Sequence, residues 1–181
     1  MTLIVAEKHK NLQKSIAVTC SAIALALSGS GLSACGAETR SGNSRQTFAY
    51  WCRQKDSLSP EAKHTVEVLL EEAGTTECDE ADRTLSSLTE LQLYNNQISD
   101  IKPLASLTNL TWLSLYNNQI SDIKPLASLT NLTWLSLDSN EISDIKPLAS
   151  LTNLKELYLS RDPIAPKTCP LKPESICSWE P

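Results

Sequence analysis

The chain has 181 residues, of which 41% are hydrophobic and only 5% are aromatic, and its formal net charge is −5 at pH 7. Because 21 acidic residues outnumber 16 basic ones, no positive charge is left over to neutralise a phosphate backbone, and nucleic acid is excluded as a partner. Most of the leucines lie between residues 88 and 159, which is typical of a repeat array and weakens the case for a compact enzyme with a core of mixed side-chain shapes.

Residues 1–34 have the composition of an export signal. Three lysines within the first 14 residues precede an apolar run at 15–27, and the segment Ser28-Gly-Ser-Gly31 ends that run. A membrane-spanning helix needs roughly 20 apolar residues, so the run is too short for a permanent anchor. We therefore expect residues 1–34 to be a signal peptide that is removed from the mature protein.

The segment Leu32-Ser-Ala-Cys35 resembles the lipobox of bacterial lipoproteins, whose cysteine becomes the lipid-modified first residue of the mature chain. The resemblance implies that Cys35 is lipidated and that the protein is exported and anchored to a membrane of the cell envelope. The alternative is ordinary cleavage nearby, with Cys35 incidental and the protein secreted in soluble form. Residues 35–47 are small and polar, and they predict a flexible tether.

Residues 48–87 are expected to form an α-helical N-terminal cap. Ser59 and Pro60 mark a helix start, because a hydroxyl can cap the first turn and proline suits the first helical position. The apolar stripe that follows consists of Ala62, Val66, Leu69, Leu70 and Ala73. Gly74 then ends the helix. His64, the only histidine outside the signal peptide, is expected at a solvated position of this helix and not as a catalytic base.

Residues 88–160 contain a 22-residue repeat in the frame L-x-x-L-x-L-x-x-N-x-I-x-x-I-x-x-L-x-x-L-x-x. Alternating leucines within each repeat predict one short strand with one buried side, and stacked repeats predict a parallel sheet. The turn after each strand carries an asparagine that is expected to be buried and structural, namely Asn96, Asn118 and Asn140. The return segments are expected to contain a tight helical turn that starts at Pro103, Pro125 and Pro147.

This frame resembles the leucine-rich repeat family in its 22-residue, internalin-like bacterial variety. The resemblance implies an α/β solenoid, a short arc with a parallel β-sheet on its concave face. It also implies a protein-binding function, because members of this family typically bind other proteins through the concave sheet. So few repeats favour a small epitope, a peptide or self-association over a wrapped domain. Residues 161–181, which contain five of the nine prolines, are expected to form a C-terminal cap in which regular structure stops.

Four cysteines remain after the signal peptide and Cys35 are set aside: Cys52, Cys78, Cys169 and Cys177. The two ends of the stack should lie more than about 10 Å apart, whereas the Cα atoms of a disulfide lie within about 7 Å. We therefore predict the pairs Cys52–Cys78 and Cys169–Cys177, one in each cap. The alternative, a four-cysteine zinc site, is opposed by the same distance and by the lack of a C-x-x-C pair.

A search for chemical motifs finds no nucleophile elbow, phosphate-binding loop or H-E-x-x-H sequence. We therefore predict that the protein is not an enzyme and has no catalytic residue, cofactor or metal. Asp100, Asp122 and Asp144 recur every 22 residues and are expected to cap the turn into each return segment. The sequons at Asn109 and Asn131 are interpreted as incidental products of the repeat.

The strand positions that alternate away from the core carry all five aromatic residues of the repeats. The aromatic positions are Trp112, Trp134, Tyr94, Tyr116 and Tyr158, and the acidic positions beside them are Glu90, Asp138 and Glu156. We interpret them as a recognition patch for a protein or peptide with basic or polar groups. Two alternatives stay open: the aromatic rings only shield the sheet, or the repeats serve a structural or self-assembling envelope protein. An enzyme that uses the cap regions is the weakest alternative.

Overall fold

The structure is a computed structural model that describes residues 46–180. The predicted signal peptide, Cys35 and nearly all of the predicted tether lie outside the described residues. The α-helices are α1 (Phe48–Arg53), α2 (Pro60–Ala73) and α3 (Cys78–Ser87). The strands are β1 (Glu90–Gln92), β2 (Trp112–Ser114), β3 (Trp134–Ser136), β4 (Glu156–Tyr158) and β5 (Cys177–Ser178). Short 3₁₀ helices are η1 (Lys55–Ser57), η2 (Lys102–Ser106), η3 (Lys124–Ser128), η4 (Lys146–Ser150) and η5 (Glu174–Ile176).

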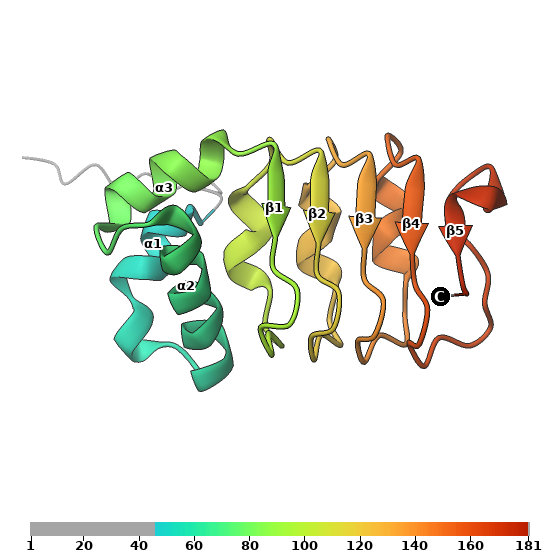
Figure 1. The fold of residues 1–181 in the computed structure, drawn as a ribbon, viewed down its shortest axis with the longest axis horizontal. Helices are drawn as coiled ribbons and strands as arrows, with labels where there is room; N and C mark the ends of the chain where they lie inside the picture. The colour runs from blue at the N-terminus through green and yellow to red at the C-terminus, as the bar shows by residue number, and fades with distance from the viewer. Residues whose placement is uncertain (1–45, 181) are drawn as a thin grey trace, which may run out of the picture. The chain divides into compact units, whose positions relative to one another are not determined.

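The N-terminal cap is a cluster of three helices beside the first repeat (Figure 1). The predicted helix is confirmed as α2: the Ser59 hydroxyl accepts a hydrogen bond from the amide of Ala62 at 3.3 Å, and Gly74 ends the helix at φ +66°. The cap prediction named no helix at α1 or α3. These helices are short, and α3 buries only Ala81 and Leu85, so neither shows the long apolar period that revealed α2.

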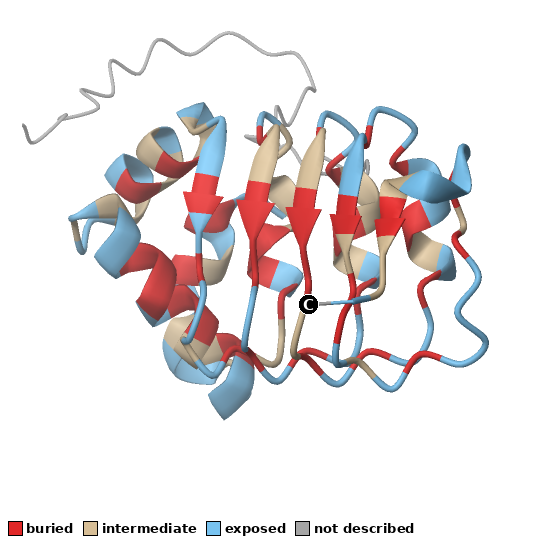
Figure 2. Cartoon of the chain, turned by 45° about the vertical axis from the view of Figure 1, so that its right-hand side comes forward, coloured by how far each residue is buried: buried red, intermediate tan, exposed pale blue. Residues whose placement is uncertain are grey.

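The strands form a parallel sheet in the order β1-β2-β3-β4-β5, in which each repeat supplies one of β1 to β4 and the C-terminal cap supplies β5 (Figure 1). The leucines at the centre of each strand are register partners, so Leu91 faces Leu113, Leu113 faces Leu135 and Leu135 faces Leu157. Each return segment contains a 3₁₀ helix with proline in its first turn, as predicted. The core is one continuous row of buried leucines and isoleucines between the strands and these returns (Figure 2).

The asparagines that follow the strands hold neighbouring repeats together. Asn118 is buried; its Oδ1 accepts from the amides of Asn96 and Ile98 at 3.2 and 2.9 Å, and its Nδ2 donates to the carbonyls of Leu93 and Leu115 at 2.7 and 2.9 Å. Asn140 is buried in the same way one repeat later. The predicted role is therefore confirmed at these two positions.

The first repeat departs from this pattern because it packs against a helix and not against another repeat. Asn96 is only half-buried, so the expectation of full burial is wrong there. His64 of α2 lies with its Nε2 2.6 Å from the carbonyl oxygen of Asn96. The expectation that His64 is solvated is also wrong: the imidazole is half-buried and joins the cap to the first turn of the solenoid.

The C-terminal cap contains more regular structure than expected. Beyond the predicted stop, η5 and β5 follow, and β5 pairs with β4 through Leu157 and Cys177. The strand β5 forms despite the nearby prolines, because the edge of β4 offers unpaired backbone N–H and C=O groups to which β5 can hydrogen-bond. The last member of the asparagine series is Asp162, whose Oδ1 accepts from the amide of Ile142 at 3.0 Å while its buried Oδ2 has no hydrogen-bond partner among the described residues.

Both predicted disulfides are present. Cys52 joins α1 to Cys78 at the start of α3 with a Cα–Cα distance of 5.6 Å, and Cys169 joins Cys177 in the C-terminal cap at 5.8 Å. Each bridge links elements of one cap. The aspartates that precede the return segments also lie as predicted, since Asp100 Oδ1 accepts from the amide of Lys102 at 3.0 Å, and Asp122 and Asp144 repeat the contact.

Candidate functional site

The strand face opposite the return helices presents three columns of side chains. The first column is Glu90, Trp112, Trp134 and Glu156, which are register partners across the four strands. The second column is Gln92, Ser114, Ser136 and Tyr158. The third column follows the strands and consists of Tyr94, Tyr116, Asp138 and Ser160. The sheet thus brings all eight predicted site residues onto this face, because side chains two residues apart on a strand share a side.

Trp112 and Trp134 form a stacked pair at the centre of the first column. Their ring centroids lie 4.3 Å apart and their planes differ by 7°. The Tyr158 ring lies 5.3 Å from that of Trp134 and is tilted by 44°. Both indoles and Tyr158 are half-buried, because each ring covers part of the next. Trp112, Trp134 and Tyr158 therefore form one aromatic ridge across β2, β3 and β4.

Tyr94 and Tyr116 occupy the third column, beyond the ends of β1 and β2. Their exposed fractions are 50% and 39%, the highest of the aromatic residues on this face. Their position in the turn gives them little contact with the leucine core. Both rings are consequently available to a partner that lies along the edge of the ridge.

The three predicted acidic residues differ in their environment. Asp138 is half-buried, and its Oδ1 accepts from the Ser160 amide at 2.9 Å and from the Ser160 hydroxyl at 2.7 Å, while its Oδ2 accepts from the Ser136 hydroxyl at 2.8 Å. The Asp138 carboxylate thus links β3 to Ser160, beyond the end of the next strand, β4, through hydrogen bonds within the face. Glu156 is exposed and accepts from the Tyr158 hydroxyl at 2.8 Å, and this bond raises the pKa of Tyr158 above its ordinary value. Glu90 is exposed and has no side-chain hydrogen bond to the described residues.

A hollow of about 610 Å³ adjoins the β1 end of the face. Its lining residues are Glu72, Leu88, Glu90, Leu91, Gln92, Tyr94 and Asn96. Glu72, from the last turn of α2, was not among the predicted site residues. The helix itself is evident in the sequence, but the proximity of its last turn to β1 depends on how the cap packs against the first repeat.

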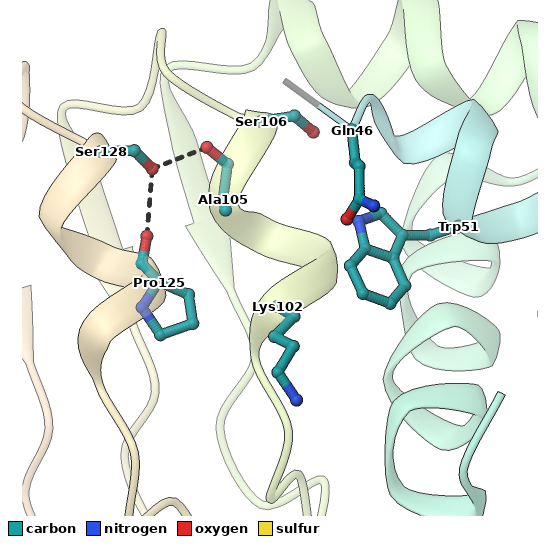
Figure 3. Close-up of a pocket in the computed structure, with 7 residues that line it drawn as sticks. All are labelled: Gln46, Trp51, Lys102, Ala105, Ser106, Pro125 and Ser128. Atoms are coloured by element: carbon teal, nitrogen blue, oxygen red, sulfur yellow. Dashed lines mark hydrogen bonds between the residues drawn. The ribbon is translucent and has the colours of Figure 1, made fainter. Parts of the chain in front are cut away.

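A second hollow, of about 290 Å³, lies between α1 and the return helices η2 and η3 (Figure 3). Its lining residues are Gln46, Trp51, Lys102, Ala105, Ser106, Pro125 and Ser128. The Ser128 hydroxyl already donates to the carbonyl oxygen of Ala105, and Lys102 is paired with Asp100. The Ser106 hydroxyl is buried without a hydrogen-bond partner among the described residues, but most of the remaining lining is apolar, so the strand face opposite the return helices is the stronger candidate.

Among residues 46–180, no three His, Cys, Asp or Glu side chains are grouped to hold a metal ion. In the same range, no helix is long and apolar enough to span a bilayer.

Comparisons with known proteins match the repeats. The family model described as leucine rich repeats (2 copies) matches residues 86–128 and 130–168. A search of curated proteins finds no match. Among solved structures, an internalin (inlF) from Listeria monocytogenes is 31% identical with a TM-score of 0.55, and the match covers 69% of this chain and 39% of that one.

Two further internalin structures from Listeria monocytogenes are similar to parts of the chain. Internalin C2 is 40% identical with a TM-score of 0.40, over 54% of this chain and 52% of that one. The functional domain of InlJ, which includes a cysteine ladder, is 26% identical with a TM-score of 0.49, over 65% of this chain and 24% of that one. The chain thus spans from about a quarter to about half of the length of each of these proteins.

The fold and the family match agree on the repeats. The 22-residue frame and the parallel sheet with one strand per turn recur through the range that the family model covers, and the buried Asn118 and Asn140 lie within it. Residues 86–168 belong to the leucine-rich repeat family and form an internalin-like solenoid.

Proposed function

We propose that this protein is a binding module that captures a protein or peptide through the ridge of Trp112, Trp134 and Tyr158. Leucine-rich repeat solenoids are generally protein-interaction modules. The observation that carries the proposal is the stacked indole pair, held at 4.3 Å on an open sheet face. Tryptophan and tyrosine supply large contact areas with few rotamers to restrict, which is why they are enriched among residues that dominate binding energy.

Sheet stability alone accounts poorly for this ridge. Cross-strand aromatic pairs stabilise a sheet by only about 0.2–1 kcal/mol. The core does not depend on them, because Leu113 and Leu135 are fully buried on the other side of the strands. Glutamate occupies the same outward position in the two flanking strands, as Glu90 in β1 and Glu156 in β4. The two indoles therefore have a role that the fold does not require.

The double substitution Trp112→Ala/Trp134→Ala is expected to reduce capture of the partner at least tenfold, because it removes the whole stacked pair. The measurement is affinity capture with the purified mature protein, followed by identification of the partner and determination of Kd. The control is Tyr50→Ala, which removes a ring of 39% exposure from α1 in the cap. An unchanged Kd in a folded double mutant would exclude the ridge as the binding site.

A structural, self-assembling envelope protein is the second candidate, because an exposed aromatic ridge on a short solenoid can also pair with a copy of itself. Sedimentation of the same double mutant separates the two functions. If the wild-type protein is oligomeric and the double mutant is monomeric, the ridge serves self-association.

We also propose that the protein acts outside the cytoplasm, anchored through lipid on Cys35. The two disulfides support export, since such bonds persist in oxidising compartments. The substitution Cys35→Ser is expected to leave an unprocessed precursor or a soluble protein, as detected by membrane fractionation and mass spectrometry. Cys20→Ser is the matched control and should change neither mass nor fractionation. A Cys35→Ser protein that stays with membranes at its normal mature mass would show that the lipobox interpretation is wrong.

A further inference from the structure

Among the described residues, the only aromatic ring that stacks on Trp112 is that of Trp134, so the side of the Trp112 indole toward β1 has no aromatic partner. The indoles of Trp112 and Trp134 are parallel within 7° and stack at 4.3 Å, a separation close to that of adjacent strands. The rings therefore stack along the direction from strand to strand. Trp134 covers one face of Trp112, and the other face is directed at the register partner of Trp112 on β1, which is Glu90.

The two ends of the ridge are not equivalent. At the β4 end, the Tyr158 ring lies against Trp134, and the Tyr158 hydroxyl is bonded to Glu156. At the β1 end, Glu90 has no side-chain hydrogen bond to the described residues, and the 610 Å³ hollow shared with Glu72 opens beside it. Among the described residues, the β1 end thus combines an indole side without an aromatic partner and a carboxylate without a side-chain hydrogen bond, and the hollow opens beside that carboxylate.

All charged side chains in the three columns of the face are acidic. The three columns contain Glu90, Asp138 and Glu156, but no lysine or arginine. Glu72 adds a further carboxylate at the β1 end. Complementary charge steers association and selects among partners, so this face favours a cationic segment and repels an acidic one.

A planar cation can contact both the Trp112 ring and the Glu90 carboxylate better than a spherical one. The guanidinium group of arginine stacks on an aromatic face through cation–π attraction while its edge donates two parallel hydrogen bonds to a carboxylate. The ammonium group of lysine attracts the same groups but cannot form this forked contact.

We propose that the concave face binds an extended segment of a partner protein that carries an arginine, with the guanidinium stacked on the β1 side of the Trp112 indole and bonded to Glu90. This inference rests on the proposed binding function and specifies the chemistry of the partner. Glu72 adds attraction from the far side of the hollow. The backbone of the segment lies across the strands, over the stacked indoles and toward Tyr158.

The test compares two synthetic peptides that differ in one side-chain group: Ac-Gly-Ser-Val-Arg-Val-Ser-Gly-NH₂ and its twin with citrulline, in which a carbonyl oxygen replaces one guanidinium nitrogen and the positive charge is lost. Binding to the mature protein is followed through tryptophan fluorescence and the indole N–H signals in NMR spectra. We expect the arginine peptide to bind about tenfold more tightly at low ionic strength, and the preference to shrink in 0.5 M salt as charges are screened.

Substitutions in the protein show which residues cause the preference for the arginine peptide. Glu90→Gln is expected to reduce the preference to about twofold, and Trp112→Ala to reduce binding of both peptides. Glu61→Gln is the matched control, because it neutralises an exposed glutamate in the first turn of α2, the same helix that carries Glu72 in its last turn. The control should keep the full preference.

Three outcomes would overturn the inference: equal binding of the two peptides, no binding of either at millimolar concentration, or an undiminished preference in Glu90→Gln. If both peptides bind equally and Trp112→Ala weakens both, the face is a binding site without charge selection, and the proposed function survives. If the arginine peptide promotes association of two protein copies in sedimentation, the site belongs to a self-assembly surface, and the inference fails.

Discussion

The substitution Asn118→Ala is expected to lower the free energy of unfolding by about 4 kcal/mol, because it removes a buried side chain that bonds to backbone groups in two repeats. After the substitution, the amides of Asn96 and Ile98 and the carbonyl of Leu93 lose their bond to this side chain, whereas the Leu115 carbonyl keeps its bond from Asn140. Each buried group left without a hydrogen bond costs about 1–3 kcal/mol.

Asn96→Ala is the matched control at the equivalent position of the first repeat. Asn96 is half-buried and its side chain donates to the Tyr94 carbonyl at 3.1 Å. Water can replace that bond, so we expect a loss of about 1 kcal/mol or less. Urea denaturation of both variants at pH 7 makes the comparison. Equal losses at the two positions would mean that burial between repeats does not determine the contribution of this asparagine.

The substitution Asp162→Asn is expected to stabilise the protein at pH 7.5 by about 1–2 kcal/mol. Asp162 stands where the repeat has an asparagine, and its buried Oδ2 occupies the place of the amide nitrogen that in Asn140 donates to the carbonyls of Leu115 and Leu137. An ionised carboxylate cannot donate. Asparagine at 162 can supply the missing donor and removes a poorly solvated charge.

The stabilisation by Asp162→Asn should depend on pH. Burial, assisted by the negative charge of Asp138, raises the pKa of Asp162 to about 6 from 3.8. Because the folded state binds the proton more tightly than the unfolded chain, this group favours folding most below about pH 4 and loses that contribution as pH rises to about 6. The half-buried carboxyl is partly screened by water, which limits the size of the effect. The gain from asparagine should therefore be small at pH 4 and full at pH 7.5.

Melting temperatures of wild type and Asp162→Asn at both pH values check this expectation. Asp144→Asn serves as the control, since Asp144 is exposed and asparagine can still accept the bond from the Lys146 amide. A stabilisation by Asp162→Asn that is the same at pH 4 and pH 7.5 would contradict the assigned titration.

The repeats were predictable because their information is local. A leucine at a fixed place in each 22-residue unit can bury its side chain only against the same place in the next unit, so the period predicts the strand, its register and the buried asparagine together. The disulfides were predictable for a related reason, since the length of the stack separates the two cysteine pairs. The α1 and α3 helices and β5 were missed, because they are short and depend on neighbours that the local sequence does not specify.

By itself, the sequence determined the solenoid, its helix α2, its disulfides and the set of aromatic residues on one face. Only the tertiary structure decided how those side chains are used. It stacked Trp112 on Trp134, drew Asp138 into hydrogen bonds within the face, and brought the last turn of α2 beside β1 to form the acidic hollow. The physical reason is that a repeat period specifies contacts between equivalent positions, whereas ring stacking, carboxylate pairing and cap docking depend on contacts between unlike ones.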